Sequence, residues 1–133
     1  MTTGVIVFAH GSRIESANEA VRTVAAELAR RAGNPDVMAA FLELGQPSLE
    51  GAAGLLAARG AGHIVILPYF LTLGLHMERD LPRMVAEIER AHPALEMTVA
   101  PPLDGHPALV EILAARLAES AAPTSSRLRR RAD

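Results

Sequence analysis

The sequence predicts an α/β protein with a four-stranded parallel sheet, helices on both faces of that sheet and flavodoxin-like layering. Strand-like and helix-like segments alternate four times along the 133 residues. The strand-like segments are short, apolar and rich in β-branched residues without polar alternation, which is typical of strands covered on both faces. Glycine or proline interrupts the chain between segments. This order predicts parallel strands joined by right-handed helical crossovers.

The first half of the chain predicts two strand–helix pairs. Residues 4–9 form an apolar run, and helical spacing then covers residues 13–32. Residues 37–44 predict a second strand, after which Pro47 stands in the first turn of a second helix, where its missing N–H costs little. The apolar stripes of these two helices are expected at Ala17, Val21, Val24 and Leu28, and at Leu49, Ala52, Ala53 and Leu56.

The second half repeats the pattern. Residues 63–69 predict a strand, residues 71–77 a loop, and a third helix is expected to begin at Asp80 as N-cap, with Pro82 in its first turn. Residues 95–100 predict the fourth strand. The apolar stripes of the third and the final helix are expected at Leu81, Met84, Val85 and Ile88, and at Leu109, Ile112, Leu113 and Leu117.

Length and composition limit the possible organisation and function. Residues 1–120 are enough for one domain, and the basic, aperiodic residues 121–133 predict a disordered tail. Four of the 13 basic residues lie in the last seven positions. The rest of the chain therefore carries a net negative charge, which disfavours binding of nucleic acid. The longest apolar run is too short to span a membrane, and no secretory leader is evident, so we expect a cytoplasmic location.

Three polar side chains are predicted at one rim of the sheet. His10 follows the first strand, Glu43 stands at the end of the second, and His76 lies on the loop after the third. Ligands of parallel sheets bind beyond the carboxyl ends of the strands. Because the chain has no cysteine, imidazole and carboxylate are its only strong metal ligands. The alternative for each histidine taken alone is a structural hydrogen bond.

Four sequence blocks together resemble the small sirohydrochlorin chelatases, over residues 5–117. They are His10-Gly11-Ser12-Arg13 followed by Asn18, Phe41-Leu42-Glu43 followed by Gln46-Pro47-Ser48, Pro68 to Leu71 followed by Gly74-Leu75-His76 and Asp80-Leu81-Pro82, and Pro102-Leu103 with His106-Pro107. The resemblance implies a class II chelatase-like fold and the insertion, without a nucleotide, of cobalt, or alternatively iron or nickel, into sirohydrochlorin or a close tetrapyrrole. It also implies a homodimer.

The same resemblance implies roles for single residues. His10 is expected to accept a pyrrole proton and to bind the metal, and His76 to be the second metal ligand. Glu43 is expected to act in catalysis or to contact the substrate. The segment lining the tetrapyrrole is expected to consist of Leu71, Thr72, Leu73, Gly74, Leu75 and His76.

Two other functions fit parts of this pattern. A non-catalytic carrier of metal or tetrapyrrole could have the same fold, because fold does not decide function. A phosphatase with His10 as nucleophile is a weaker alternative, since Ala9 stands where such enzymes usually have arginine. The other histidines have structural interpretations: His63 at a strand start, His92 at a helix end and His106 at a helix entrance.

Overall fold

The computed structural model describes residues 2–121 and divides into two compact units, Met1–Pro102 and Leu103–Asp133. A single domain over residues 1–120 stays a prediction, and the predicted tail lies outside the described residues apart from Ala121. Within residues 2–121, every helix is too short or too polar to cross a membrane.

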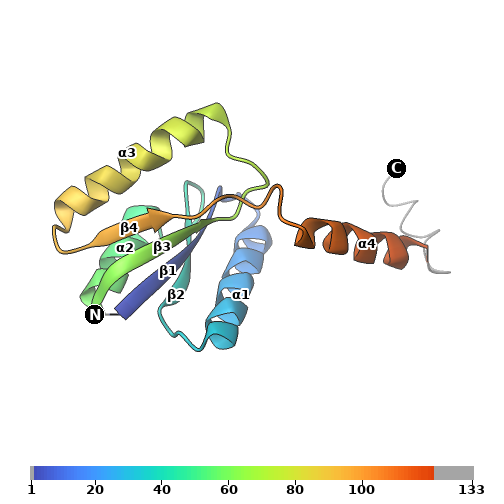
Figure 1. The fold of residues 1–133 in the computed structure, drawn as a ribbon, viewed down its shortest axis with the longest axis horizontal. Helices are drawn as coiled ribbons and strands as arrows, with labels where there is room; N and C mark the ends of the chain where they lie inside the picture. The colour runs from blue at the N-terminus through green and yellow to red at the C-terminus, as the bar shows by residue number, and fades with distance from the viewer. Residues whose placement is uncertain (1, 122–133) are drawn as a thin grey trace. The chain divides into compact units, whose positions relative to one another are not determined.

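The first unit is built on a four-stranded parallel sheet, as predicted. Its strands are β1 (Thr2–Ala9), β2 (Val37–Phe41), β3 (Ala61–Pro68) and β4 (Glu96–Val99). They lie in the order β2-β1-β3-β4, which is visible in Figure 1. The central position of β1 brings the segments that follow β1, β2 and β3 to the same edge of the sheet.

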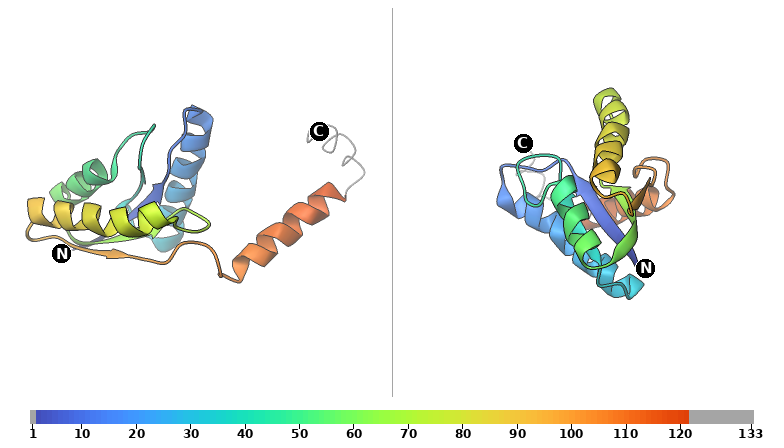
Figure 2. Two further views of the ribbon diagram at one scale, coloured as in Figure 1. Left: turned by 90° about the horizontal axis from the view of Figure 1, so that it is seen from above. Right: turned by 90° about the vertical axis from the view of Figure 1, so that its left-hand side faces the viewer.

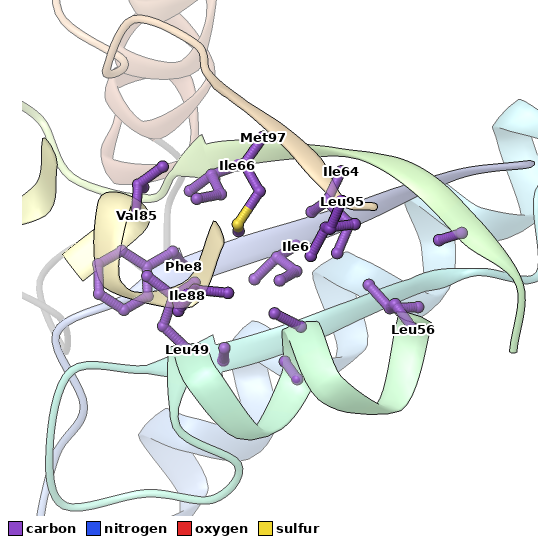
Figure 3. Packing of buried hydrophobic residues seen from close by; sticks show 14 of the residues in the cluster. Ile6, Phe8, Leu49, Leu56, Ile64, Ile66, Val85, Ile88, Leu95 and Met97 are labelled. Atoms are coloured by element: carbon purple, nitrogen blue, oxygen red, sulfur yellow. The ribbon is translucent and has the colours of Figure 1, made fainter. Parts of the chain in front are cut away.

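Helices cover both faces of this sheet, which confirms the predicted layering (Figure 2). Ile6 and Phe8 of β1 point into a layer shared with α2 (Leu49–Ala58) and α3 (Leu75–Ala91), and Figure 3 shows this packing. Val7 and Ala9 point to the other face, against α1 (Glu15–Ala32). The second unit contains α4 (Ala108–Ser120), the predicted final helix. The buried stripe predicted for this helix is wrong, because none of its residues is buried and Leu117 is 71% exposed.

The buried side of α1 differs from the predicted stripe. Val21 is buried as expected, but Val24 is 40% exposed, and the other buried residues of α1 are Asn18 and Ala25. The spacing of 18, 21 and 25 follows one helical face as well as the predicted spacing does. The prediction was wrong because it ranked positions by hydrophobicity, whereas Asn18 is buried through hydrogen bonds.

The segment between β2 and α2 is a longer loop than predicted. β2 ends at Phe41 rather than at residue 44, where Leu44 has a positive φ of 56° that breaks the extended conformation. Pro47 precedes α2 instead of occupying its first turn. Ser48 is the N-cap, and its hydroxyl accepts a hydrogen bond from the Gly51 N–H. The predicted stripe Leu49, Ala52, Ala53 and Leu56 is buried.

The third helix begins six residues earlier than predicted. Gly74, not Asp80, is the N-cap of α3, and Pro82 lies inside the helix. A helix interior normally excludes proline at a cost of about 3 kcal/mol. Here the apolar stripe continues back to Met77 through the buried Leu81, so packing against the sheet outweighs the lost hydrogen bond. His76 therefore lies in a first helical turn rather than on a loop.

Candidate functional site

The candidate site begins where the neighbouring strands β1 and β2 end. His10 directly follows β1, and Glu43 comes two residues after β2. Their strands are paired up to Ala9 and Phe41, so the two following segments leave the sheet side by side. The His10 Nε2 atom lies 3.4 Å from Glu43 Oε2. The prediction that both residues gather at the carboxyl edge of the sheet is confirmed.

Both side chains of this pair are open to solvent, with exposed fractions of 58% for His10 and 55% for Glu43. A contact between two such exposed side chains contributes little to stability. The exposure instead leaves the two groups accessible to a substrate that approaches the edge of the sheet. The other ring nitrogen of His10, Nδ1, lies 3.3 Å from the Gly11 carbonyl oxygen, so an oxygen acceptor faces each nitrogen.

Backbone contacts hold the two segments together. The N–H groups of Leu42 and Glu43 donate to the carbonyls of Ala9 and His10, at 2.9 and 3.1 Å. Gly11 has a φ of 96°, and a Cβ added to it would lie 1.7 Å from the Glu43 carbonyl oxygen. Only glycine allows this approach. The close contact with the Glu43 backbone therefore explains why a glycine directly follows His10.

The segment after β3 reaches the same edge of the sheet. The Tyr69 N–H donates to the Phe8 carbonyl at 2.7 Å, which ties this segment to the end of β1. It exposes large apolar side chains, among them Leu71 (65%) and Leu75 (80%). Large apolar side chains that are exposed together on a surface are typical of a binding site. They belong to the segment predicted to line the tetrapyrrole, Leu71, Thr72, Leu73, Gly74, Leu75 and His76.

His76 is exposed in the first turn of α3. Within the part of the chain that is described, three or more histidine, aspartate or glutamate side chains nowhere come close enough to hold a metal ion. The structure thus pairs His10 with Glu43 but does not add His76 to them as a third ligand. The role of His76 stays a prediction.

Charged groups on α1 hold the loop that carries Glu43. Arg22 donates to Glu15 at 2.6 Å and to the Gln46 carbonyl at 3.0 Å. Its guanidinium carbon lies 5.2 Å from the centroid of the Phe41 ring. The hydrogen bond from Arg22 lowers the pKa of Glu15 below its usual value. This carboxylate therefore keeps its charge, and its bond to Arg22, down to a lower pH than a free glutamate would.

A cavity of about 330 Å³ lies beside this loop but does not include the pair. It is lined by Phe41 and Leu42 together with residues of α2 and α3, and Glu50 and Glu87 contribute its charged groups. Two carboxylates disfavour an anionic ligand there. The open surface around His10 and Glu43 is the better candidate for a substrate site.

The remaining histidines have the structural roles that the sequence predicts. His63 stands near the start of β3, and its Nε2 lies 2.8 Å from the Thr98 hydroxyl. His92 is the C-cap of α3. In the second unit, the Nδ1 of His106 accepts a hydrogen bond from the Ala108 N–H at 3.0 Å, at the entrance to α4.

Comparison with known proteins identifies the family. The CbiX family profile matches residues 4–120. A sirohydrochlorin cobaltochelatase of Sulfolobus acidocaldarius is 33% identical over 83% of this chain and 85% of its own length. A chloroplastic sirohydrochlorin ferrochelatase of Arabidopsis thaliana is 29% identical over 86% of this chain, which spans 51% of that longer protein.

A solved structure gives the same fold. The sirohydrochlorin chelatase SirB of Bacillus subtilis subspecies spizizenii, in complex with cobalt, superposes with a TM-score of 0.83 at 23% identity, over 91% of this chain and 52% of SirB. The four-stranded parallel sheet and its helices are therefore those of known chelatases. Since the family profile covers almost the whole chain, this protein belongs to the CbiX family.

Proposed function

We propose that this protein is a chelatase that inserts a divalent metal, cobalt foremost, into sirohydrochlorin without using a nucleotide. The observation that carries the proposal is the exposed pair of His10 and Glu43, 3.4 Å apart at the carboxyl edge of the sheet, in a CbiX family chain. Related proteins named as cobaltochelatase and ferrochelatase support metal insertion as the reaction. Iron and nickel are the alternative metals, and the proposed location is the cytoplasm.

The separation within the pair suits one shared metal ion. Two metal–ligand bonds of about 2.1 Å that meet at the tetrahedral angle place their ligand atoms roughly 3.4 Å apart. The Nε2 of His10 and the Oε2 of Glu43 are 3.4 Å apart. His10 and Glu43 would fill two coordination positions and leave the others to water or to the nitrogens of the tetrapyrrole. Such partial coordination favours release of the metal, whereas a closed four-ligand site would retain it.

The same pair can remove a proton. The ring must lose two pyrrole protons as the metal enters, and a neutral imidazole can take one of them. Once protonated, His10 would carry a hydrogen on each nitrogen, and the Gly11 carbonyl and the Glu43 carboxylate are the nearby acceptors. We therefore assign metal binding through Nε2 to His10, followed by proton acceptance at the same nitrogen once the metal has left it for the ring. Glu43 takes the partner role in catalysis and substrate contact.

Residues 71–76 form the proposed surface for the tetrapyrrole ring. Their exposed leucines offer apolar contact to the ring plane. His76, at the end of this surface, is proposed as the second histidine ligand of the metal. We further propose a homodimer, which is what the resemblance to the small sirohydrochlorin chelatases implies.

The alternative function as a histidine phosphatase lacks support from the geometry. A phosphoester carries negative charge and needs N–H donors or guanidinium groups around it. The group next to His10 Nε2 is instead the carboxylate of Glu43. It would repel a phosphate and weaken its binding.

Metal insertion by the purified protein tests the proposal against the carrier alternative. We expect the absorbance of sirohydrochlorin to change through many metallations per protein molecule with Co²⁺, above the rate measured without protein. Fe²⁺ and Ni²⁺ in parallel reactions rank the metals. A yield limited to one metallated ring per protein molecule would indicate a carrier, and a rate equal to the background would contradict both functions.

The apolar surface at residues 71–76 makes a separate prediction. Leu75→Glu is expected to raise KM for sirohydrochlorin about tenfold, because it removes apolar contact and repels the carboxylates of the substrate. A glutamate in the first turn of α3 is compatible with the helix, so folding should be unaffected. Leu55→Glu, at a leucine of α2 that is 53% exposed, is the control. Equal KM values for the two variants would contradict this substrate surface.

A further inference from the structure

Asn18 is the only buried polar residue of the described chain, with an exposed fraction of 1%. It lies on the first turn of α1, on the side that faces the sheet. A buried amide needs partners for all of its polar atoms. The Oδ1 of Asn18 accepts from the Ser12 N–H, and its Nδ2 donates to the carbonyls of Ser12 and Leu44, each at 2.9 Å. The Glu15 carboxylate is a more distant neighbour of Nδ2, at 3.4 Å.

These three short bonds join the two segments that carry the candidate pair. Ser12 comes two residues after His10, and Leu44 directly follows Glu43. The amide therefore holds both segments to one point on α1. It supplements the backbone bond between Glu43 and His10, which lies nearer to the sheet.

The backbone around Leu44 is shaped for this contact. Leu44 has a φ of 56°, a left-handed conformation that costs a residue with a side chain about 1 kcal/mol. At the next position, a Cβ added to Gly45 would lie 3.1 Å from the Asn18 Nδ2 and 2.8 Å from Phe41. A side chain there would crowd the amide. The loop thus adopts an unfavourable conformation in which its carbonyl meets Asn18.

We propose that Asn18 is a positioning residue for metal binding, which keeps His10 and Glu43 at a separation where both can coordinate one ion. The inference rests on the proposed chelatase function. Asn18 itself is buried and does not touch the metal. Residues that orient metal ligands in this way typically change metal affinity about 10- to 100-fold when replaced.

Asn34 provides a matched control. Its Oδ1 accepts from the Asp36 N–H at 2.9 Å, and its Nδ2 donates to the Thr3 carbonyl at 3.0 Å. It therefore bridges two chain segments through the same chemistry, but at the start of β1 and β2, the opposite end of these strands from His10 and Glu43. If the asparagines only stabilise the fold, replacing either of them should have a similar effect on Co²⁺ affinity. If Asn18 positions the metal ligands, only Asn18→Ala should weaken Co²⁺ binding.

The experiment compares Asn18→Ala and Asn34→Ala in binding Co²⁺ alone, measured by calorimetry where circular dichroism shows both variants folded. We expect Asn18→Ala to bind Co²⁺ about 10- to 100-fold more weakly and Asn34→Ala to bind within about twofold of the parent. If Asn18→Ala does not fold, Asn18→Ser, whose hydroxyl keeps one polar group, takes its place. Equal Co²⁺ affinities for parent and Asn18 variant would overturn the inference.

A double-mutant cycle with Glu43→Gln adds a readout that a purely structural role would not change. If Asn18 acts by aligning the pair, Glu43→Gln should weaken Co²⁺ binding less in the Asn18→Ala background than in the parent. Additive effects would overturn the inference, as would a parent protein that binds no Co²⁺. If the parent protein binds Co²⁺ through His10 but never metallates sirohydrochlorin, only the proposed chelatase function is refuted. The comparison of Co²⁺ affinities then still tests the role of Asn18.

Discussion

Replacing His10 by alanine is expected to lower the rate of cobalt insertion into sirohydrochlorin by about 10²- to 10⁴-fold, the usual contribution of a positioned general base. The variant loses the imidazole that lies 3.4 Å from Glu43 and with it one metal ligand. The rate is measured optically with the protein-free background subtracted. Because the His10 side chain is 58% exposed, the variant should remain folded.

His92→Ala is the control for this variant. His92 is the C-cap of α3, which begins at the carboxyl edge of the sheet and ends at the other, so it lies away from the candidate pair. Its removal should leave the insertion rate within about twofold of the parent, since surface substitutions usually have small effects. Glu43→Gln combined with His10→Ala should cost little more than His10→Ala alone if the pair acts as a unit. Full activity of His10→Ala would contradict the assigned role.

The second large effect is expected from Gly11→Ala. The added methyl carbon would lie 1.7 Å from the Glu43 carbonyl oxygen, and the φ of 96° is unfavourable for alanine. The obstacle is backbone, which cannot rotate aside as a flexible side chain can. We expect the free energy of unfolding to fall by at least about 2 kcal/mol, measured by urea denaturation. Insertion activity of the folded fraction should also fall, because relief of the clash separates His10 from Glu43.

Gly54→Ala is the matched control for the stability effect. Gly54 lies inside α2, and a Cβ added there meets no atom within 4 Å. Alanine favours a helix interior by about 0.5–1 kcal/mol over glycine, so this variant should be slightly more stable than the parent. If Gly11→Ala were as stable and as active as the parent, the close contact between the His10 and Glu43 segments would not exist in solution.

Local patterns predicted most of the elements but not their boundaries. The apolar spacing of α2 correctly predicted its buried face, which consists of Leu49, Ala52, Ala53 and Leu56. The start of α3 was placed too late because Asp80 followed by Pro82 resembles a helix entrance. Burial of Leu81 beneath the helix overrides that signal. Asn18 was recognised only as part of a family motif, since nothing local shows that a polar residue will be buried.

The sequence alone was enough to predict an α/β fold, a parallel sheet and the positions of His10 and Glu43 after two strands. These features depend on apolar periodicity and on glycine and proline breaks, which are local patterns of a few residues. Which strands become neighbours depends on contacts between distant segments. The tertiary structure alone established the order β2-β1-β3-β4, the 3.4 Å approach of His10 to Glu43, and the three short bonds by which Asn18 joins their loops.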